Sequence, residues 1–362
     1  MTETSSSQRR PTIKDVAQHA GVSFKTVSRV VNNEPGVRAE LRERVNASVE
    51  ALGFKPNLAA RSLSGGRSFL IGLISQQTEE DFRDNYSYLL AIEAGLLDRC
   101  RELGYSLAIE VVRAEADPKD ELRAALGGMA RDALILLPPV SDDAEVLAAL
   151  EKTGAPLVRF SPTWGLDRTA HVRMDDDAAA FALTTALIEA GHRRIGLVAG
   201  HPRHGSASER RRGHVRALLA AGLDIDEALI AQGYFTEESG FEAARLLLDV
   251  ADPPTAIFAS NDNMAVGVRR AARERGLTVP VDLSVVGFDG LSTVLDGWPT
   301  LTTVRQPLYE MARAAIDAAH AIILGDAPPA SVLDYVQLAG ATISPPNPGA
   351  VRSAKRSDEI VG

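Results

Sequence analysis

Two groups of residues have the types and spacing that chemistry needs, and the first is a short basic group near the N-terminus. Lys25 and Arg29 stand one helical turn apart, and Phe24 precedes them. Lysine and arginine side chains donate hydrogen bonds to the acceptor atoms that guanine exposes in the major groove of DNA. This group therefore predicts side chains that read base edges.

The second group consists of polar and aromatic residues placed after predicted strands. Ligands of open α/β sheets bind beyond the carboxyl ends of the strands, so these positions are the first candidates for a binding site. Such ends carry Gln76, Ser161, Asn261, Asp289 and Gln306. Tyr88 and Phe235 could add flat apolar faces for a ring-shaped ligand, although such residues more often belong to a core.

Three consecutive arginines fall in the first turn of a predicted helix over 207–222, where Ser206 and Glu209 are spaced as a capping box. A cation there opposes the helix dipole, which disfavours it by roughly 0.3–1 kcal/mol. We therefore expect a ligand to hold Arg210 in place. Arg211 and Arg212 can equally form a solvated face paired with Glu209.

Catalytic and metal-binding patterns are absent from the sequence. The seven histidines form no HExxH pair, and the single cysteine, Cys100, excludes a disulfide framework and a multi-cysteine metal site. Neither a Walker A motif, nor a GxGxxG after a strand, nor a GxSxG elbow occurs. We therefore expect no catalytic residues, no metal and no cofactor.

The basic group lies in a predicted pair of short helices over residues 12–31. Thr12 and Ser23 are placed as N-caps, and Gly21 ends the first helix. Two short helices joined by a tight glycine turn predict a helix-turn-helix, whose second helix enters the major groove. A third helix is expected over 39–52; Arg38 stands where its cap should be, and we interpret Arg38 as a phosphate contact.

From Phe69 onward, short apolar strands alternate with amphipathic helices, which predicts two similar lobes of parallel sheet with a cleft between them. The expected strands are 69–75, 106–112, 133–137, 156–160, 194–199, 256–260, 283–288 and 301–304. The expected helices are 86–103, 119–130, 142–153, 177–191, 207–222, 237–251, 262–276 and 308–324. Residues 57–64 are too few for a stable isolated helix. They form either a plain linker or a segment that orders against a partner.

Charge is distributed unevenly along the 362 residues. Net charge is −9, yet the first 67 residues hold 11 Lys/Arg against 6 Asp/Glu. A basic module fused to an acidic body is expected of a protein whose DNA contacts are confined to one end. The start carries no apolar run, and no stretch approaches the roughly 20 apolar residues of a membrane span. We therefore expect a cytoplasmic location and no membrane partner.

Several motifs together resemble the LacI/GalR family of bacterial transcriptional regulators, over residues 12 to about 344. They are the signature VSxxTVSR at 22–29, PNLAARSL at 56–63, AGHRRI at 190–195, SND at 260–262 and SVVGFD at 284–289. The resemblance implies a helix-turn-helix headpiece and a two-lobed α/β core like that of periplasmic binding proteins. The implied divisions are a disordered tail over 1–11, the headpiece over 12–56, a hinge over 57–66, the core over 67–344 and a second disordered tail over 345–362.

The resemblance also assigns roles to residues. Bases would be read by Phe24, Lys25 and Arg29, and phosphates would be held by Thr12, Ser23, Thr26, Ser28 and Asn32. Asn57 and Leu63 would belong to a hinge that folds on DNA, with Leu63 wedged into the minor groove. An effector would be bound by Gln76, Tyr88, Ser161, Arg210, Phe235, Asn261 and Asp289, with Gln306 at a crossover between lobes. Ser161 departs from the aspartate common at its position, and Arg38 departs from the usual cap.

Taken together, these expectations describe a homodimer that binds an inverted-repeat operator on double-stranded DNA. Its binding would be controlled by a small-molecule effector, which we expect to be a sugar. Its expected role is to repress genes of carbohydrate uptake or catabolism. A pure ligand-binding or transport protein would instead need a secretory segment and no basic headpiece. A sugar-active enzyme would need paired carboxylates in the cleft, for which Asp262 and Asp289 are the candidates.

Overall fold

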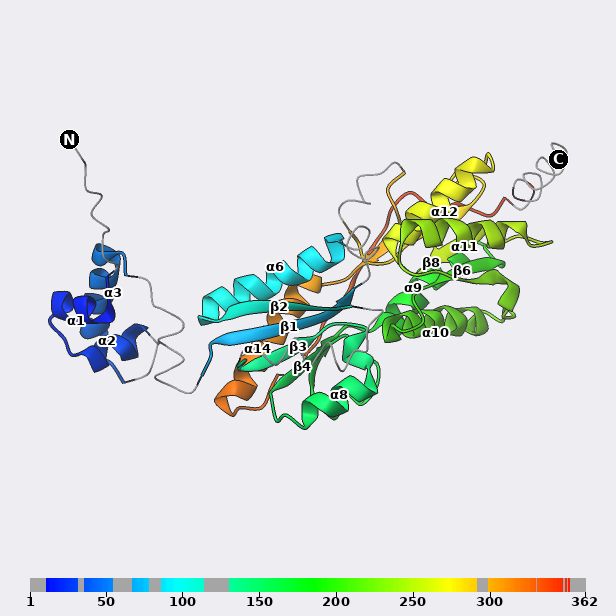
Figure 1. Ribbon diagram of the computed structural model, residues 1–362. Coiled ribbons are helices and arrows are strands. Elements are labelled where there is room, and N and C mark those ends of the chain that lie inside the picture. The colour runs from blue at the N-terminus through cyan, green and yellow to red at the C-terminus, as the bar shows by residue number, and fades with distance from the viewer. Residues whose placement is uncertain are drawn as a thin grey trace, which may run out of the picture. The chain divides into compact units, whose positions relative to one another are not determined.

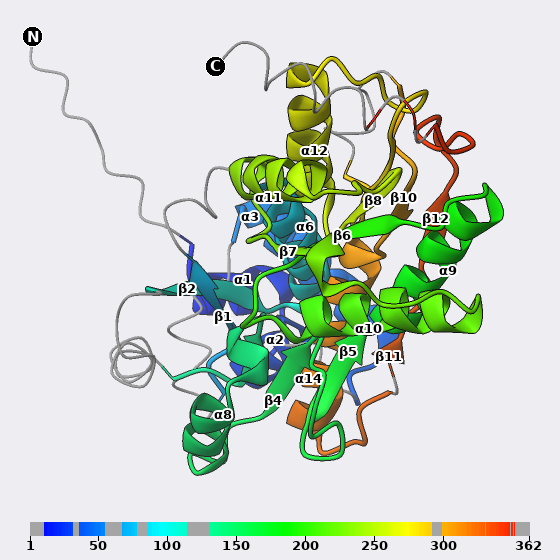
Figure 2. The ribbon, with the colours of Figure 1, turned by 90° about the vertical axis from the view of Figure 1, so that its right-hand side faces the viewer.

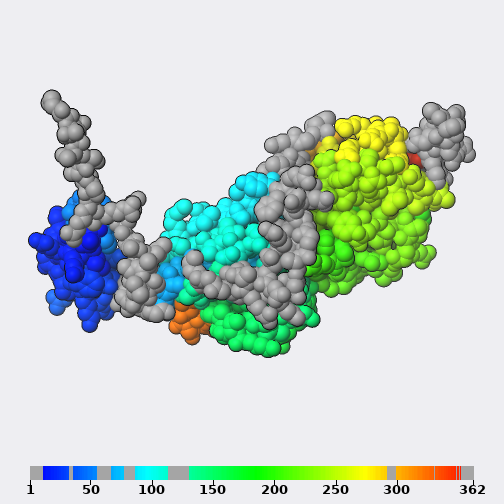
Figure 3. Space-filling view, in the orientation of Figure 1, coloured from blue at the N-terminus to red at the C-terminus, as the bar shows by residue number. Residues whose placement is uncertain are grey.

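The structure is a computed structural model that describes residues 11–31, 36–54, 67–77, 86–113, 130–291, 299–329, 331–347, 349 and 351. The other residues are grey in Figures 1 and 3. The chain divides into two compact units, Met1–Phe69 and Leu70–Gly362, which are described separately below. None of the helices described has the length and apolar character that a membrane span requires.

The first unit is a bundle of three helices. They are α1 (Ile13–Ala20), α2 (Phe24–Val31) and α3 (Ala39–Leu52). Thr12 caps α1 reciprocally with Asp15, and Gly21 ends it in the left-handed conformation at φ 61°. Ser23 Oγ accepts a hydrogen bond from Thr26 N at 3.1 Å and so begins α2. The expected helix-turn-helix is therefore confirmed, with Val16 and Val27 fully buried in its core.

The second unit contains two lobes, and the first is built on a parallel sheet of six strands. Its order is β11-β5-β4-β3-β1-β2. The strands are β1 (Leu70–Gln77), β2 (Ser106–Arg113), β3 (Ala133–Leu136), β4 (Leu157–Phe160), β5 (Ala170–Arg173) and β11 (Ser331–Val332). The helices are α6 (Tyr86–Leu103), α8 (Ala144–Glu151) and α14 (Leu308–Leu324), with the short turn η1 (Val140–Asp142). Helices α6 and α14 pack against each other along the sheet (Figure 1).

The second lobe has a parallel sheet of four strands in the order β7-β6-β8-β9. The strands are β6 (Ile195–Ala199), β7 (Ile230–Gln232), β8 (Ala256–Ala259) and β9 (Ser284–Val286). The helices are α9 (Asp176–Glu189), α10 (Gly205–Ala220), α11 (Glu237–Asp249) and α12 (Asp262–Glu274), with the short turn η2 (Glu227–Leu229). Helices α9 and α10 pack as one pair, and α11 and α12 pack as another (Figure 2).

The chain passes between the lobes after β5, returns after β10 (Thr303–Arg305), and crosses again to β12 (Val336–Leu338). Strands β10 and β12 pair antiparallel beside the second lobe. Two lobes of parallel sheet are thus confirmed, while the short strands β5, β7, β11 and β12 were not expected from the sequence. The predicted helix over 119–130 falls almost wholly outside the described residues.

Two local expectations were wrong. Helix α10 begins at Gly205, two residues early, and its cap residue His204 makes no side-chain cap. Glu209 does not close a capping box with Ser206, because both of its oxygens accept hydrogen bonds from Arg212 at 2.5 and 2.6 Å. Val351, within the tail predicted from 345, is buried in the core of the second lobe.

Candidate functional sites

The candidate DNA-reading residues lie on α2, where burial of one face leaves the other open. Val27 and Val30 are buried in the bundle, whereas Phe24 is 53% exposed and Lys25 is exposed beside it. Arg29 is half-buried. Because α2 is short and firmly packed on one side, its first turn can present these side chains without distorting the core.

The hydroxyl groups expected to hold phosphates are already ordered by neighbouring side chains. Thr12 Oγ1 donates to Asp15 Oδ2 at 2.7 Å, and the hydroxyls of Ser23 and Thr26 lie 2.8 Å apart. Arg38 is exposed at the start of α3 and makes no side-chain cap, as its guanidinium chemistry requires. Ser28 is half-buried on α2. The remaining predicted DNA-binding residues, Asn32, Asn57 and Leu63, lie outside the described residues.

The candidate effector site is a cavity of about 610 Å³, including the space open to solvent at its mouth. Its lining comes from both lobes of the second unit: Gln76, Tyr88, Leu89, Pro138, His204, Ser206, Arg210, Phe235, Asn261 and Asp289. The structure thus brings together every predicted effector residue except Ser161. Ser161 follows β4, is buried, and adopts a left-handed backbone at φ 49°, but it does not line the described part of the cavity.

Four lining residues were missed by sequence reasoning. Pro138 and Leu89 are apolar, so a search for polar residues after strands did not find them. Pro138 follows a predicted strand, and Leu89 follows Tyr88. His204 is one of the seven histidines that form no HExxH pair, and Ser206 was interpreted only as a helix cap. Both residues lie at the start of α10. Since Arg210 was already a candidate on this helix, its neighbours at the start of the helix could have been predicted as lining residues too.

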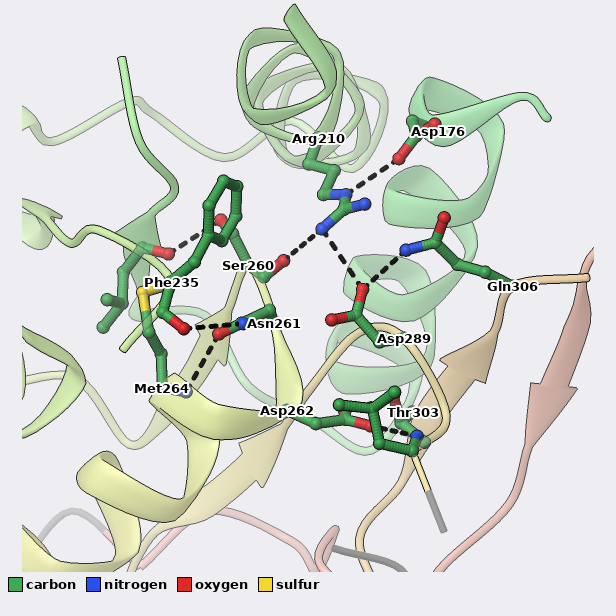
Figure 4. A network of polar contacts seen from close by, with 12 residues as sticks. Asp176, Arg210, Phe235, Ser260, Asn261, Asp262, Met264, Asp289, Thr303 and Gln306 are labelled. Carbon is green, nitrogen blue, oxygen red and sulfur yellow. Dashed lines mark hydrogen bonds and ion pairs between the residues drawn. The ribbon is translucent and has the colours of Figure 1, made fainter. Parts of the chain in front are cut away.

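Arg210 forms the centre of a buried polar network (Figure 4). Its Nε donates to Asp176 Oδ1 at 2.8 Å, and its Nη1 donates to the Ser260 carbonyl at 2.6 Å. Nη1 also lies 3.6 Å from Asp289 Oδ1, which accepts a hydrogen bond from Gln306 Nε2 at 2.6 Å. We expected a ligand to hold Arg210 in place, and the structure shows that the protein's own carboxyl groups also hold it.

The two neighbouring arginines differ from Arg210. Arg211 reaches Glu227 at 3.0 Å, and Arg212 contacts Asp177 and Glu209 at 2.5 Å each. Both arginines are substantially exposed. They form the solvated face that was the alternative interpretation.

Burial governs the charge state of the cavity. It raises the pKa of Asp289 to about 8 against the opposing effect of Arg210, and it also raises the pKa of Asp176. Burial would lower the pKa of Arg210, but these two carboxyl groups raise it above its ordinary value. Burial lowers the pKa of His204 to about 3, so its imidazole is neutral. The cavity therefore sets one arginine against two carboxyl groups whose protonated forms burial favours, and these groups can donate hydrogen bonds to a ligand and accept them from it.

Asn261 positions the aromatic wall of the cavity. As the cap of α12, its Oδ1 accepts from Met264 N at 2.9 Å, while its Nδ2 donates to the Phe235 carbonyl at 2.9 Å. That second bond holds Phe235 in a left-handed backbone conformation at φ 67°. Phe235 consequently faces the cavity from a fixed position.

Asp262 does not provide the second carboxylate that an enzyme would need. Its Oδ1 accepts from Thr303 Oγ1 at 2.6 Å, and its Oδ2 accepts from Leu291 N at 2.9 Å. The side chain is fully buried and does not line the described cavity. It joins α12 to the segments on either side of residues 292–298.

A helix-turn-helix unit followed by a two-lobed ligand-binding unit defines the class of ligand-responsive DNA-binding regulators. Residues 12–57 match the bacterial regulatory proteins of the lacI family, and residues 184–338 match the periplasmic binding protein-like domain. Catabolite control protein A of Priestia megaterium is 34% identical over 308 residues, covering 84% of this chain and 90% of that protein. The chain belongs to the LacI family of DNA-binding transcriptional regulators.

Solved structures of relatives extend over both units. The transcriptional regulator CelR in complex with cellobiose superposes with a TM-score of 0.71 at 31% identity, covering 92% of this chain and 100% of that one. The lac repressor dimer bound to operator and the anti-inducer ONPF gives a TM-score of 0.74 at 28% identity, covering 93% and 100%. These relatives are transcription regulators and not enzymes, in agreement with the expectation that no catalytic residues are present.

Proposed function

We propose that this regulator is a repressor controlled by a sugar that binds in the cavity between the lobes. The observation that carries the proposal is the convergence of Arg210, Asn261 and Asp289 on one side of Phe235. Charged and amide groups that fix hydroxyls, set beside an aromatic face for the apolar side of a ring, are the combination that a sugar requires. The CelR structure with cellobiose adds support from a relative.

The cavity keeps hydrogen-bonding capacity for a ligand after the protein's own bonds are counted. Within the described residues, Nη2 of Arg210 makes no hydrogen bond, whereas Nε and Nη1 are engaged. Asp289 offers its second oxygen, since Oδ1 is the atom that contacts Gln306 and Arg210. Two neighbouring hydroxyl groups of a sugar could bind here, one accepting a hydrogen bond from Arg210 Nη2 and the other donating one to the second oxygen of Asp289.

For DNA, we propose that Lys25 and Arg29 read bases together with Phe24. The phosphate contacts would come from Thr12, Ser23, Thr26, Ser28, Asn32 and Arg38. The exposed start of α2 supports this division, because Phe24 and Lys25 are exposed there while Val27 and Val30 anchor the helix. Asn57 and Leu63 would act in the hinge, with Leu63 as an apolar wedge at the operator centre.

We further propose that the functional unit is a homodimer bound to an inverted repeat. Leu90 and Leu97 are exposed two turns apart on α6, and Ile109 and Val111 are exposed on one face of the edge strand β2. A two-fold axis would let one copy cover this apolar surface on the other. Such a regulator would act in the cytoplasm, where its operator lies.

Calorimetry with the full-length protein tests the proposed ligand. A panel of mono- and disaccharides is titrated into wild type and into Asp289→Ala, with Leu219→Ala as an exposed control on the same lobe. We expect at least one sugar to bind wild type and the control equally and to lose binding in Asp289→Ala. If purine bases bind and sugars do not, the carbohydrate assignment fails.

A further inference from the structure

Four aromatic rings form a continuous row that runs from the cavity wall to the protein surface. The ring centroids of Phe235 and His204 are 5.3 Å apart, those of His204 and His201 are 5.3 Å apart, and those of His201 and Tyr234 are 5.6 Å apart. Phe235 and His204 line the cavity, whereas Tyr234 is 47% exposed. The row therefore continues beyond the enclosed part of the site.

The two loops that carry the row are fastened to each other. Gln232 Nε2 donates to the carbonyls of Gly200 and Gly233 at 2.7 and 2.6 Å. A Cβ at Gly200 would lie 2.4 Å from the Phe235 ring, so the close approach of the loops depends on this glycine. Tyr234 N donates to Ser239 Oγ at 2.9 Å, which ties the exposed end of the row to α11. The rings are thus held in place before any ligand arrives.

Polar groups accompany the row at the mouth of the cavity. Arg203, between the two histidines in sequence, donates from Nη2 to Gln76 Oε1 of the other lobe at 2.6 Å. His204 is uncharged for the reason given above, so it offers a ring face without a charge that must stay hydrated. The aromatic rings can pack against the apolar face of a sugar ring, and the Arg203 guanidinium and Gln76 amide beside them can hydrogen-bond to its hydroxyl groups.

We propose that His201 and Tyr234 form a second sugar-ring subsite, so that the effector is a glycoside of at least two rings. This proposal rests on the carbohydrate function proposed above. The first ring lies in the enclosed part of the cavity against Phe235, and the second lies along the row toward Tyr234. The rings of His201 and Tyr234 continue the row from the lining residues His204 and Phe235, so a second ring can lie outside the enclosed part of the cavity.

Matched pairs of sugars test the subsite in the full-length protein. Glucose is compared with cellobiose and maltose, and galactose with lactose, by calorimetry on wild type, Tyr234→Ala and Tyr234→Phe. We expect wild type to bind one disaccharide more tightly than its monosaccharide. Tyr234→Ala should weaken that disaccharide by about 3- to 10-fold, because one aromatic contact is lost, and should leave the monosaccharide unchanged. Tyr234→Phe keeps the ring and should keep the affinity.

The outcomes separate this proposal from the one on which it rests. Equal affinity for mono- and disaccharides, or equal loss of both in Tyr234→Ala, overturns the subsite and leaves the carbohydrate function standing. Failure of every sugar to bind wild type contradicts both. Because Tyr234→Phe retains the packing of the row, a loss of disaccharide binding in that variant also counts against ring stacking as the cause.

Discussion

Substituting Gly205 with alanine should separate the two lobes at the edge of the cavity. Gly205 is the first residue of α10 and lies against the loop after β4 in the other lobe. A Cβ at this position would lie 2.1 Å from Thr163 Oγ1 and 2.3 Å from Asp142 Oδ2. Real Cβ contacts essentially never fall below 3.0 Å, so one lobe must move by about 1 Å.

The opposing loop cannot easily give way, because it is braced from inside its own lobe. The Asp142 carboxylate accepts from Thr163 N and Thr163 Oγ1 at 3.0 and 2.9 Å, and its carbonyl accepts from Trp164 Nε1 at 2.9 Å. The fully buried Arg159 donates to the Trp164 carbonyl at 2.8 Å. The displacement should therefore appear between the lobes instead of within one of them.

The size of the effect of Gly205→Ala follows from two opposing contributions to the free energy. Alanine favours a helix over glycine by up to about 1 kcal/mol, so α10 itself gains stability. Overpacking of a tight contact costs about 1–3 kcal/mol. Because the cavity is lined from both lobes, we expect this cost to appear in ligand binding, as a loss of about 5- to 150-fold in affinity for the bound sugar.

Calorimetry measures this loss, with Ser208→Ala as a control that adds alanine to an exposed position of α10. Thr163→Ala removes two of the three atoms nearest to the new Cβ, so the double variant with Gly205→Ala should recover part of the affinity. Unchanged sugar binding in Gly205→Ala would refute the reasoning. So would a double variant in which the two losses simply add.

Three further predictions concern the headpiece, the polar network and pH. Arg29→Ala should relax sequence preference by about 1–3 kcal/mol per contact, measured by binding to operator and to random DNA; an equal loss on both would identify a phosphate contact instead. Asp289→Ala should abolish the effect of the sugar on operator affinity while operator binding itself remains, because Arg210 keeps Asp176 as its partner; loss of the circular dichroism of the folded protein would show a structural role instead. Burial lowers the pKa of His214 from 6.5 to about 4. As the pH falls, the unfolded chain therefore binds a proton at this histidine before the folded protein does. The free energy of unfolding should decrease by about 3 kcal/mol over that pH interval. Denaturant unfolding from pH 7 to pH 4 should give a flatter profile for His214→Gln, and an unchanged profile would contradict the assignment.

The sequence predicted elements best where local chemistry decides them. Thr12, Gly21 and Ser23 define the ends of α1 and α2 by their own hydrogen bonds or backbone conformation, and the structure has these caps as expected. Strands such as β5 and β11 have only four and two residues, and their pairing partners come from distant segments. No local pattern indicates such strands, because the sheet and not the sequence window stabilises them.

The sequence predicted most of the residues that line the cavity, but it did not predict which side chains contact one another there. Parallel strands end at one edge of a sheet, so Asn261 and Asp289 could be expected to meet in the second lobe. Gln76 lies near the end of β1 in the first lobe and lines the same cavity. The role of Asp176 could not be read in the same way. It begins α9, and its contact with Arg210 depends on how α9 packs against α10. Ser161 does not line the described cavity, and its left-handed backbone after β4 could not be read from the sequence either.

The central claim is that a sugar bound between the lobes controls sequence-specific DNA binding. The most direct test is a fluorescence anisotropy titration of the full-length protein on an operator selected from random DNA, with and without the sugar that binds in calorimetry. The account predicts that the selected site is an inverted repeat and that the sugar changes its affinity by about 5- to 150-fold. Selection of no common sequence, or an affinity that the bound sugar leaves unchanged, would contradict it.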